Sequence, residues 1–143
     1  METTTPKVIL TALKNDLKEK FNLASGYNFD LADVKIGNFF FQDFKIKPAI
    51  GIWGALETPE EYKMGGVIVT LLTIKVYAFL NTDGVSNSLD IYDMSQDIRA
   101  FVKSTNFTYK NDVIIGEVFN YPGGPQDKQS ISITDIDIRY NQV

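Results

Sequence analysis

Apolar residues near the start of the chain follow a helical pattern. From Ile9 to Phe21 they recur every three or four positions, and lysines fall on a different face. Thr5 and Pro6, just before this run, suit the N-cap and first turn of a helix. The spacing therefore predicts an amphipathic helix from Lys7 to Lys20 that packs on a sheet.

A second helical run lies in the second half of the chain. Its apolar residues, spaced by three and four, are Ile91, Met94, Ile98 and Phe101. Ser88 is a favourable N-cap for this helix. Beside the apolar face runs an acidic stripe, formed by Asp90, Asp93 and Asp97.

Other segments have the alternation or the β-branched content of strands. They are Ala49–Leu56, Val67–Phe79, Val113–Tyr121 and Ser130–Tyr140, with a shorter candidate at Val34–Ile36. Gly51 and Gly54 indicate a bulge or a close approach of the backbone. In the last strand the apolar positions change face near Thr134 and Asp135. This change predicts a bulge, or two halves that bury opposite sides.

Loops separate these elements. Glu57 to Lys63 is expected to form an acidic loop that ends at Gly65 and Gly66, and Tyr121 to Lys128 a second one. The order of elements predicts a single α+β domain over residues 1–143. Its sheet is expected to be mostly antiparallel, with four to five strands and two main helices packed on one face.

Composition narrows the function. The 143 residues include neither cysteine nor histidine, so thiol chemistry, thiolate metal sites and histidine-based catalysis are excluded. The net charge is -4, which disfavours nucleic-acid binding through a basic patch. A negative net charge is compatible with a protein surface past which DNA moves without binding to it. Neither a secretory signal nor a membrane-spanning segment is expected.

Few residues suggest chemistry. Asp135 and Asp137 share one face of the last strand and could hold Mg²⁺ or Ca²⁺ if Asp127 or Glu117 supplied a third carboxylate. Alternating charge on a wet strand face is the simpler interpretation. The sequence thus predicts no catalytic residue, no metal site and no cofactor, and the protein is not expected to be an enzyme.

Aromatic residues are more informative. Four rings fall within six positions, at Phe39, Phe40, Phe41 and Phe44. So many neighbouring rings are expected either to enter the core or to meet another chain.

The layout as a whole resembles the tail terminator proteins of long-tailed bacteriophages. The segments that carry the resemblance are the N-terminal helix, GGVIVTLLTIKVYAF, SLDIYDMSQDIRAFV, VIIGEVFNY and SISITDIDIRY. It covers nearly the whole chain and includes no catalytic motif. The resemblance implies a structural virion protein that forms a ring, hexameric in that family, on the end of the tail tube. Such a ring ends tube polymerisation and joins the tail to the head.

The resemblance also implies partners and places. The partners are further copies of this chain, the tail tube protein, the head–tail connector protein and DNA passing through the lumen without specific binding, with no membrane. The protein would occupy the virion tail or neck, and the host cytoplasm during assembly. Candidate interface residues are Phe39, Phe40, Phe41, Phe44, Trp53, Glu60, Glu61 and Tyr121. Candidate lumen residues are Asp90, Asp93 and Asp97.

Three other functions stay open on the sequence. One is a head–tail connector or neck adaptor, which has the same biology with another neighbour. The second is a small ligand-binding domain that uses the aromatic-rich sheet as a pocket. The third is a metal-dependent enzyme built on Asp135 and Asp137.

Overall fold

The fold is that of a computed structural model, which describes residues 4–37, 47–81, 89–123 and 128–142. Its helices are α1 (Pro6–Lys20) and α3 (Asp90–Val102). Its strands are β1 (Asp33–Ile36), β2 (Ala49–Tyr62), β3 (Ile68–Asn81), β4 (Val113–Tyr121) and β5 (Gln129–Gln142). Short 3-10 turns are η1 (Leu23–Ser25), η3 (Met64–Gly66) and η4 (Lys110–Asp112).

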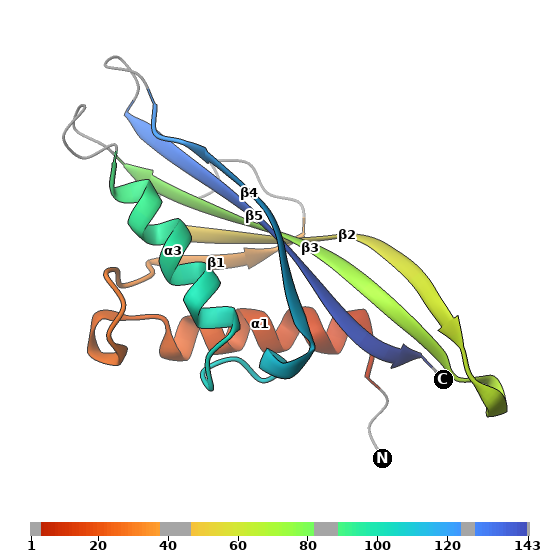
Figure 1. Cartoon of the computed structure of the whole chain (residues 1–143). Coiled ribbons are helices and arrows are strands. Elements are labelled where there is room, and N and C mark those ends of the chain that lie inside the picture. The colour runs from red at the N-terminus through yellow and green to blue at the C-terminus, as the bar shows by residue number, and fades with distance from the viewer. Residues whose placement is uncertain (1–3, 38–46, 82–88, 124–127, 143) are drawn as a thin grey trace.

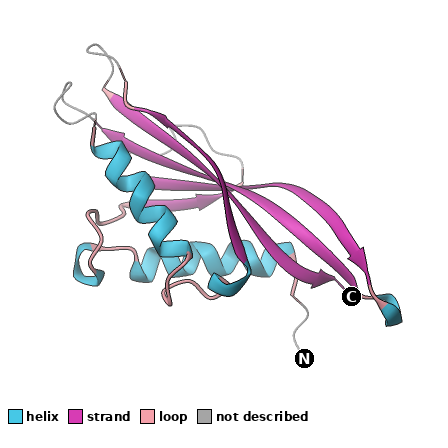
Figure 2. Cartoon of the chain, viewed as in Figure 1, coloured by secondary structure: helices cyan, strands magenta, loops and turns pink. Residues whose placement is uncertain are grey.

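The described strands form one sheet in the order β1-β2-β3-β5-β4 (Figure 2). Only the β1–β2 pair is parallel. The predicted α+β class and the mostly antiparallel sheet are confirmed.

Both helices contribute to one core cluster with the sheet (Figure 1). Thr5 caps α1 by accepting a hydrogen bond from the amide of Val8, and Pro6 is the first helical residue, as predicted. Every apolar position predicted for the two helices from Ile9 to Phe101 is buried, apart from Leu10, which is partly buried. The helix-facing side of β3 is formed by alternate residues from Leu72 to Leu80, as its alternation predicted.

The close approach predicted at the β2 glycines occurs at Gly54. A Cβ atom added there would lie 3.1 Å from Cδ1 of Leu10 on α1. A register shift between Gly54 and Leu56 marks the predicted bulge. The missing side chain therefore lets α1 lie directly on β2.

The apolar residues of β5 do change face as predicted, since Ile131 packs with Ala49 and Phe79 whereas Ile136 and Ile138 lie in the main core. The predicted alternative of a bulge in β5 is wrong. β5 pairs with β3 in unbroken register from Gln129 to Gln142, and its buried positions alternate throughout. In the first half these positions hold Ser130, Ser132 and Thr134, all fully buried. Small hydroxyl residues face the core where the hydrophobic pattern predicts aliphatic ones, because α3 packs closely against β5.

The predicted acidic loop after Leu56 is also wrong, because β2 continues as a strand to Tyr62. Cross-strand bonds hold this acidic segment in the sheet: Tyr140 donates to Glu57 and Arg139 donates to Glu60. Pro59 is tolerated because β1 pairs only with Ala49–Ile52. Beyond that point β2 has no outer neighbour among the described strands. The chain turns at Gly65 and Gly66, both with a φ of 81°.

These extended strands build a feature that the sequence did not predict. β2, β3 and β5 run together past the N-terminal end of α1 and finish at η3 and the C-terminal end of β5 (Figure 1). We call residues 57–73 with 137–142 the arm.

Candidate functional site

The outer strand β4 presents large apolar side chains to solvent. Ile114, Phe119 and Tyr121 are exposed, and Phe119 keeps 60% of its surface accessible. They pair with Asp137, Ile133 and Ile131 of β5, on the face of the sheet that the helices leave free. An edge strand with an apolar face is a common site of association between chains.

A second group of exposed apolar residues lies on β2. Trp53 and Leu56 of β2 are both exposed, and Trp53 pairs with Lys75 on the face away from the helices. β3 and β5 separate these residues from Tyr121 on β4. The predicted interface residues Trp53 and Tyr121 therefore lie on the same face of the sheet, but two strands separate them and the structure does not bring them together.

The end of the arm is a third exposed surface. Met64 is 98% exposed and Tyr62 is 76% exposed. Glu60 accepts a 2.9 Å hydrogen bond from Nε of Arg139, and its carboxylate raises the pKa of that guanidinium. Glu61 is exposed beside it. Both predicted acidic interface residues therefore lie on the arm, near its apolar tip.

Sequence analysis missed most of these exposed side chains. The alternation and turn patterns predict only ordinary strand or loop positions for the exposed residues Ile114, Phe119, Leu56, Tyr62 and Met64. The available signal was the alternation of the strands, because Phe119 and Ile114 lie out of phase with the helix-facing positions of β4. The predicted interface residues Phe39, Phe40, Phe41 and Phe44 lie outside the described residues.

The three acids predicted for a lumen differ in their surroundings. Asp90 and Asp93 are exposed in the first turn of α3, where the helix dipole favours acids. Asp97 is partly buried and accepts hydrogen bonds from the amide of Asn28 at 2.8 Å and from its side chain at 3.2 Å. Asp97 therefore also fixes the loop after α1, whereas Asp90 and Asp93 make no hydrogen bond or ion pair with the described residues. Ser88, the predicted N-cap, lies outside the described residues.

Asp135 and Asp137 bind neighbours on β3. Nζ of Lys75 lies 3.0 Å from Oδ1 of Asp135, and Oγ1 of Thr73 donates a 2.7 Å bond to Asp137. The hydrogen bond from Lys75 to Asp135 raises the lysine pKa. Across the described residues no group of three or more potential metal ligands is found. The pairing agrees with the simpler prediction of alternating charge on a strand face.

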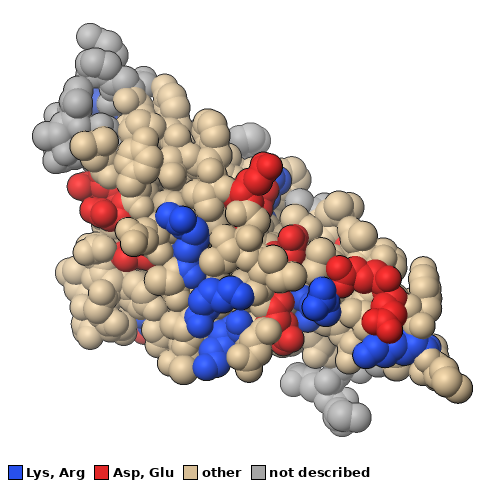
Figure 3. All heavy atoms as spheres, viewed as in Figure 1, with Lys and Arg blue, Asp and Glu red and all other residues tan. Residues whose placement is uncertain are grey.

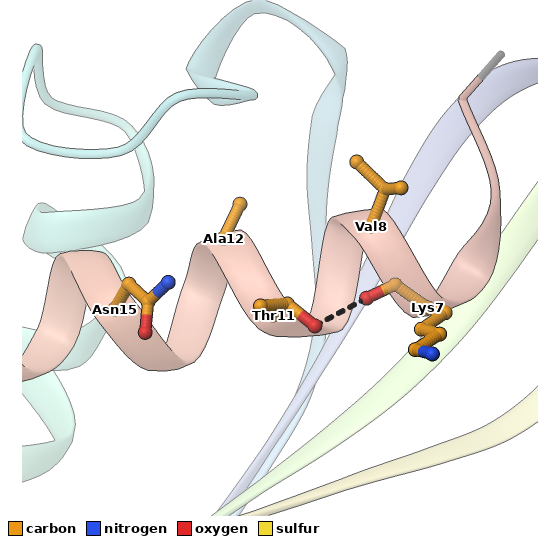
Figure 4. Close-up of a pocket in the computed structure, with 5 residues that line it drawn as sticks. All are labelled: Lys7, Val8, Thr11, Ala12 and Asn15. Carbon is orange, nitrogen blue, oxygen red and sulfur yellow. Dashed lines mark hydrogen bonds between the residues drawn. The ribbon is translucent and has the colours of Figure 1, made fainter. Parts of the chain in front are cut away.

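A shallow groove runs along the outside of α1 (Figure 4). It offers about 490 Å³ of space and is lined by Lys7, Val8, Thr11, Ala12 and Asn15. Thr11 donates its hydroxyl to the carbonyl of Lys7 at 2.7 Å, so this donor is already used. All lining residues come from one helix, which suits a protruding side chain of another molecule better than an enclosed small ligand.

No protein-family model matches the chain, and comparison with curated proteins gives no significant match. Within the described ranges, no helix is both long and apolar enough to cross a membrane.

Proposed function

We propose that this chain is a structural virion protein that assembles into a ring on the end of a phage tail tube. The ring ends polymerisation of the tube and provides the surface that joins the tail to the head. The proposal rests on the layout of the elements, which resembles tail terminator proteins, and on the exposed surfaces of the fold.

One observation carries the assembly part of the proposal. The exposed apolar residues of β4 and those of β2 project from one face of the sheet, on strands that β3 and β5 separate. A ring of identical subunits needs two different surfaces on each subunit that meet head to tail. An isologous dimer would need only one self-complementary patch. The two separate apolar surfaces, one on β4 and one on β2, thus favour a ring.

The remaining features fit a ring in specific ways. Two helices packed on one face of the sheet leave the other face for contacts with neighbouring proteins. The exposed carboxylates of Asp90 and Asp93 would face DNA and repel it, which keeps the passage free of binding. We propose six subunits from the resemblance alone.

The first test is the mass of the protein in solution, measured by light scattering over a range of concentrations, with negative-stain images of the same samples. We expect closed rings of about six copies, either free or after addition of tail tubes. A second measurement adds the protein to growing tubes and follows their length. Growth that stops at bound rings supports the proposal. Rings that do not bind the tube but bind the head–tail connector protein would favour the function of a neck adaptor.

A further inference from the structure

We propose that the arm of one copy lies along α1 of the next copy, with Met64 and Tyr62 over the groove at Val8 and Ala12. The inference rests on the proposed function and deepens it, because it adds a contact between neighbouring subunits to the one expected through β4 and β2. It commits to a second copy of this chain as the occupant of the groove.

The arm is held in its extended shape before any contact is made. Its outer strands are joined by the bond from Tyr140 to Glu57 at 2.5 Å and by the ion pair from Arg139 to Glu60 at 2.9 Å. Thr70 and Gln142 add a 3.4 Å contact near its end. Because these bonds hold the arm past the end of α1 (Figure 1), its tip points away from the α1 groove of its own chain.

The charges of the two surfaces are opposite. The acids of the arm outnumber its bases by four to two: Glu57, Glu60, Glu61 and Asp137 against Lys63 and Arg139. α1 carries four lysines, and of its two acids Asp16 is buried against Thr108. Figure 3 shows acidic side chains over the arm, with basic ones beside them, and several basic side chains over the helical layer. Such complementarity orients two copies head to tail and disfavours arm-to-arm contact.

The shapes are also complementary. The arm ends in a protruding methionine, a flexible side chain that fills irregular apolar gaps. The groove has Val8 and Ala12 along its length, and the small alanine leaves room for such a side chain. Val8 and Ala12 are only partly buried within one copy, so a neighbour would cover apolar surface that is now wet.

Cysteine pairs give a direct test, because the chain has no cysteine of its own. One copy carries Met64→Cys, and a second copy with a mass tag carries Ala12→Cys. Under mild oxidation we expect a disulfide-linked pair of tagged and untagged copies that reductant reverses. Thr11→Cys, on the exposed side of the same groove, replaces Ala12→Cys if that variant unfolds at a lower temperature. The matched control is Leu23→Cys, which is 58% exposed beyond the end of α1.

Charge exchange gives an independent readout. Glu61→Lys and Lys7→Glu should each weaken self-association roughly two- to fivefold per contact, as exposed ion pairs do. The double variant Glu61→Lys/Lys7→Glu exchanges the two charges, so opposite charges face each other again. It should recover most of the affinity of one copy for another. A higher salt concentration should weaken the self-association of the wild type and of the double variant alike.

The outcomes separate this inference from the proposed function. Linkage of Met64→Cys to Leu23→Cys as fast as to Ala12→Cys, or no linkage in a strictly monomeric protein, overturns the arm contact. Rings that stop tube growth without the Met64–Ala12 linkage also overturn it and leave the proposed function standing. Specific linkage in a protein that never stops tube growth supports the arm contact and counts against the proposed function.

Discussion

The phenol of Tyr140 donates a 2.5 Å hydrogen bond to Oε1 of Glu57. Tyr140 belongs to β5 and Glu57 to β2, so the bond passes over β3, which lies between them. It forms where the arm joins the rest of the sheet, and Tyr140 is buried there as part of the main core cluster. Burial of the phenol, together with the neighbouring carboxylate, raises the pKa of Tyr140 to about 12.

Replacing this phenol gives a prediction with a defined pH dependence. Tyr140→Phe should lower the free energy of unfolding by roughly 1 kcal/mol at neutral pH, through loss of the bond. Because the folded pKa is raised from 10.0 to about 12, the contribution is complete below pH 10 and is lost as the pH rises through 12. Urea unfolding of both proteins should show the difference shrinking across that range. A difference that stays constant would contradict the assignment.

A buried acid joins α1 to the segment after α3. Asp16 accepts hydrogen bonds from the amide of Thr108 at 2.9 Å and from its hydroxyl at 2.8 Å. Asp16→Ala should lower the free energy of unfolding by about 2–3 kcal/mol, since it leaves a partly buried amide unpaired. Asn15→Ala on the exposed side of the same helix is the control, with an expected change below about 0.5 kcal/mol. Equal effects of the two variants in denaturant unfolding would rule out this role.

The hydroxyl of Thr134 is buried and has no hydrogen-bond partner among the described residues. Thr134→Val keeps the shape and removes the unpaired oxygen, so we expect the free energy of unfolding to rise by about 1 kcal/mol. Thr73→Val on the neighbouring strand is the matched control, because that hydroxyl donates to Asp137 and its loss should destabilise. A loss of stability in Thr134→Val would instead indicate an ordered water at this position.

Substitution of the exposed Phe119 tests whether the apolar surface of β4 contacts a neighbouring copy. Phe119→Ser should leave the melting temperature nearly unchanged and should weaken self-association about tenfold or more, because the ring contributes to contact with a neighbour and not to the core. Leu23→Ser, an equally exposed site, is the control. Light scattering of the variants at matched concentrations measures the effect. Unaltered association of Phe119→Ser would remove β4 from the interface.

The paired acids of β5 test the metal hypothesis. Asp135→Asn breaks a partly exposed ion pair with Lys75, so the expected loss in the free energy of unfolding is at most about 1 kcal/mol. Addition of a chelator should leave thermal unfolding unchanged in the wild type and in the variant. A drop in the wild-type melting temperature on chelation, absent from Asp135→Asn, would reinstate a cation site.

The elements with strong local signals were predicted closely. Thr5, Pro6 and the spacing of apolar residues predicted α1 to its last residue, Lys20. Helix capping and the burial of one helix face depend on residues close together in the sequence, so they can be predicted from it. The alternation of β3 assigned its two faces correctly for the same reason. The predicted placement of Trp53 on the face opposite Ile52 also followed from alternation.

Tertiary structure decided what local pattern does not encode. Ser132 and Thr134 are buried in β5, the strand against which α3 packs, and no hydrophobic pattern reveals a core position filled by hydroxyl residues. The arm exists because Glu57 and Glu60 find partners on β5, about 80 residues further along the chain. Local sequence sets which segments can be helix or strand. Contacts between distant segments set how far the strands extend and which side chains stay exposed for a partner.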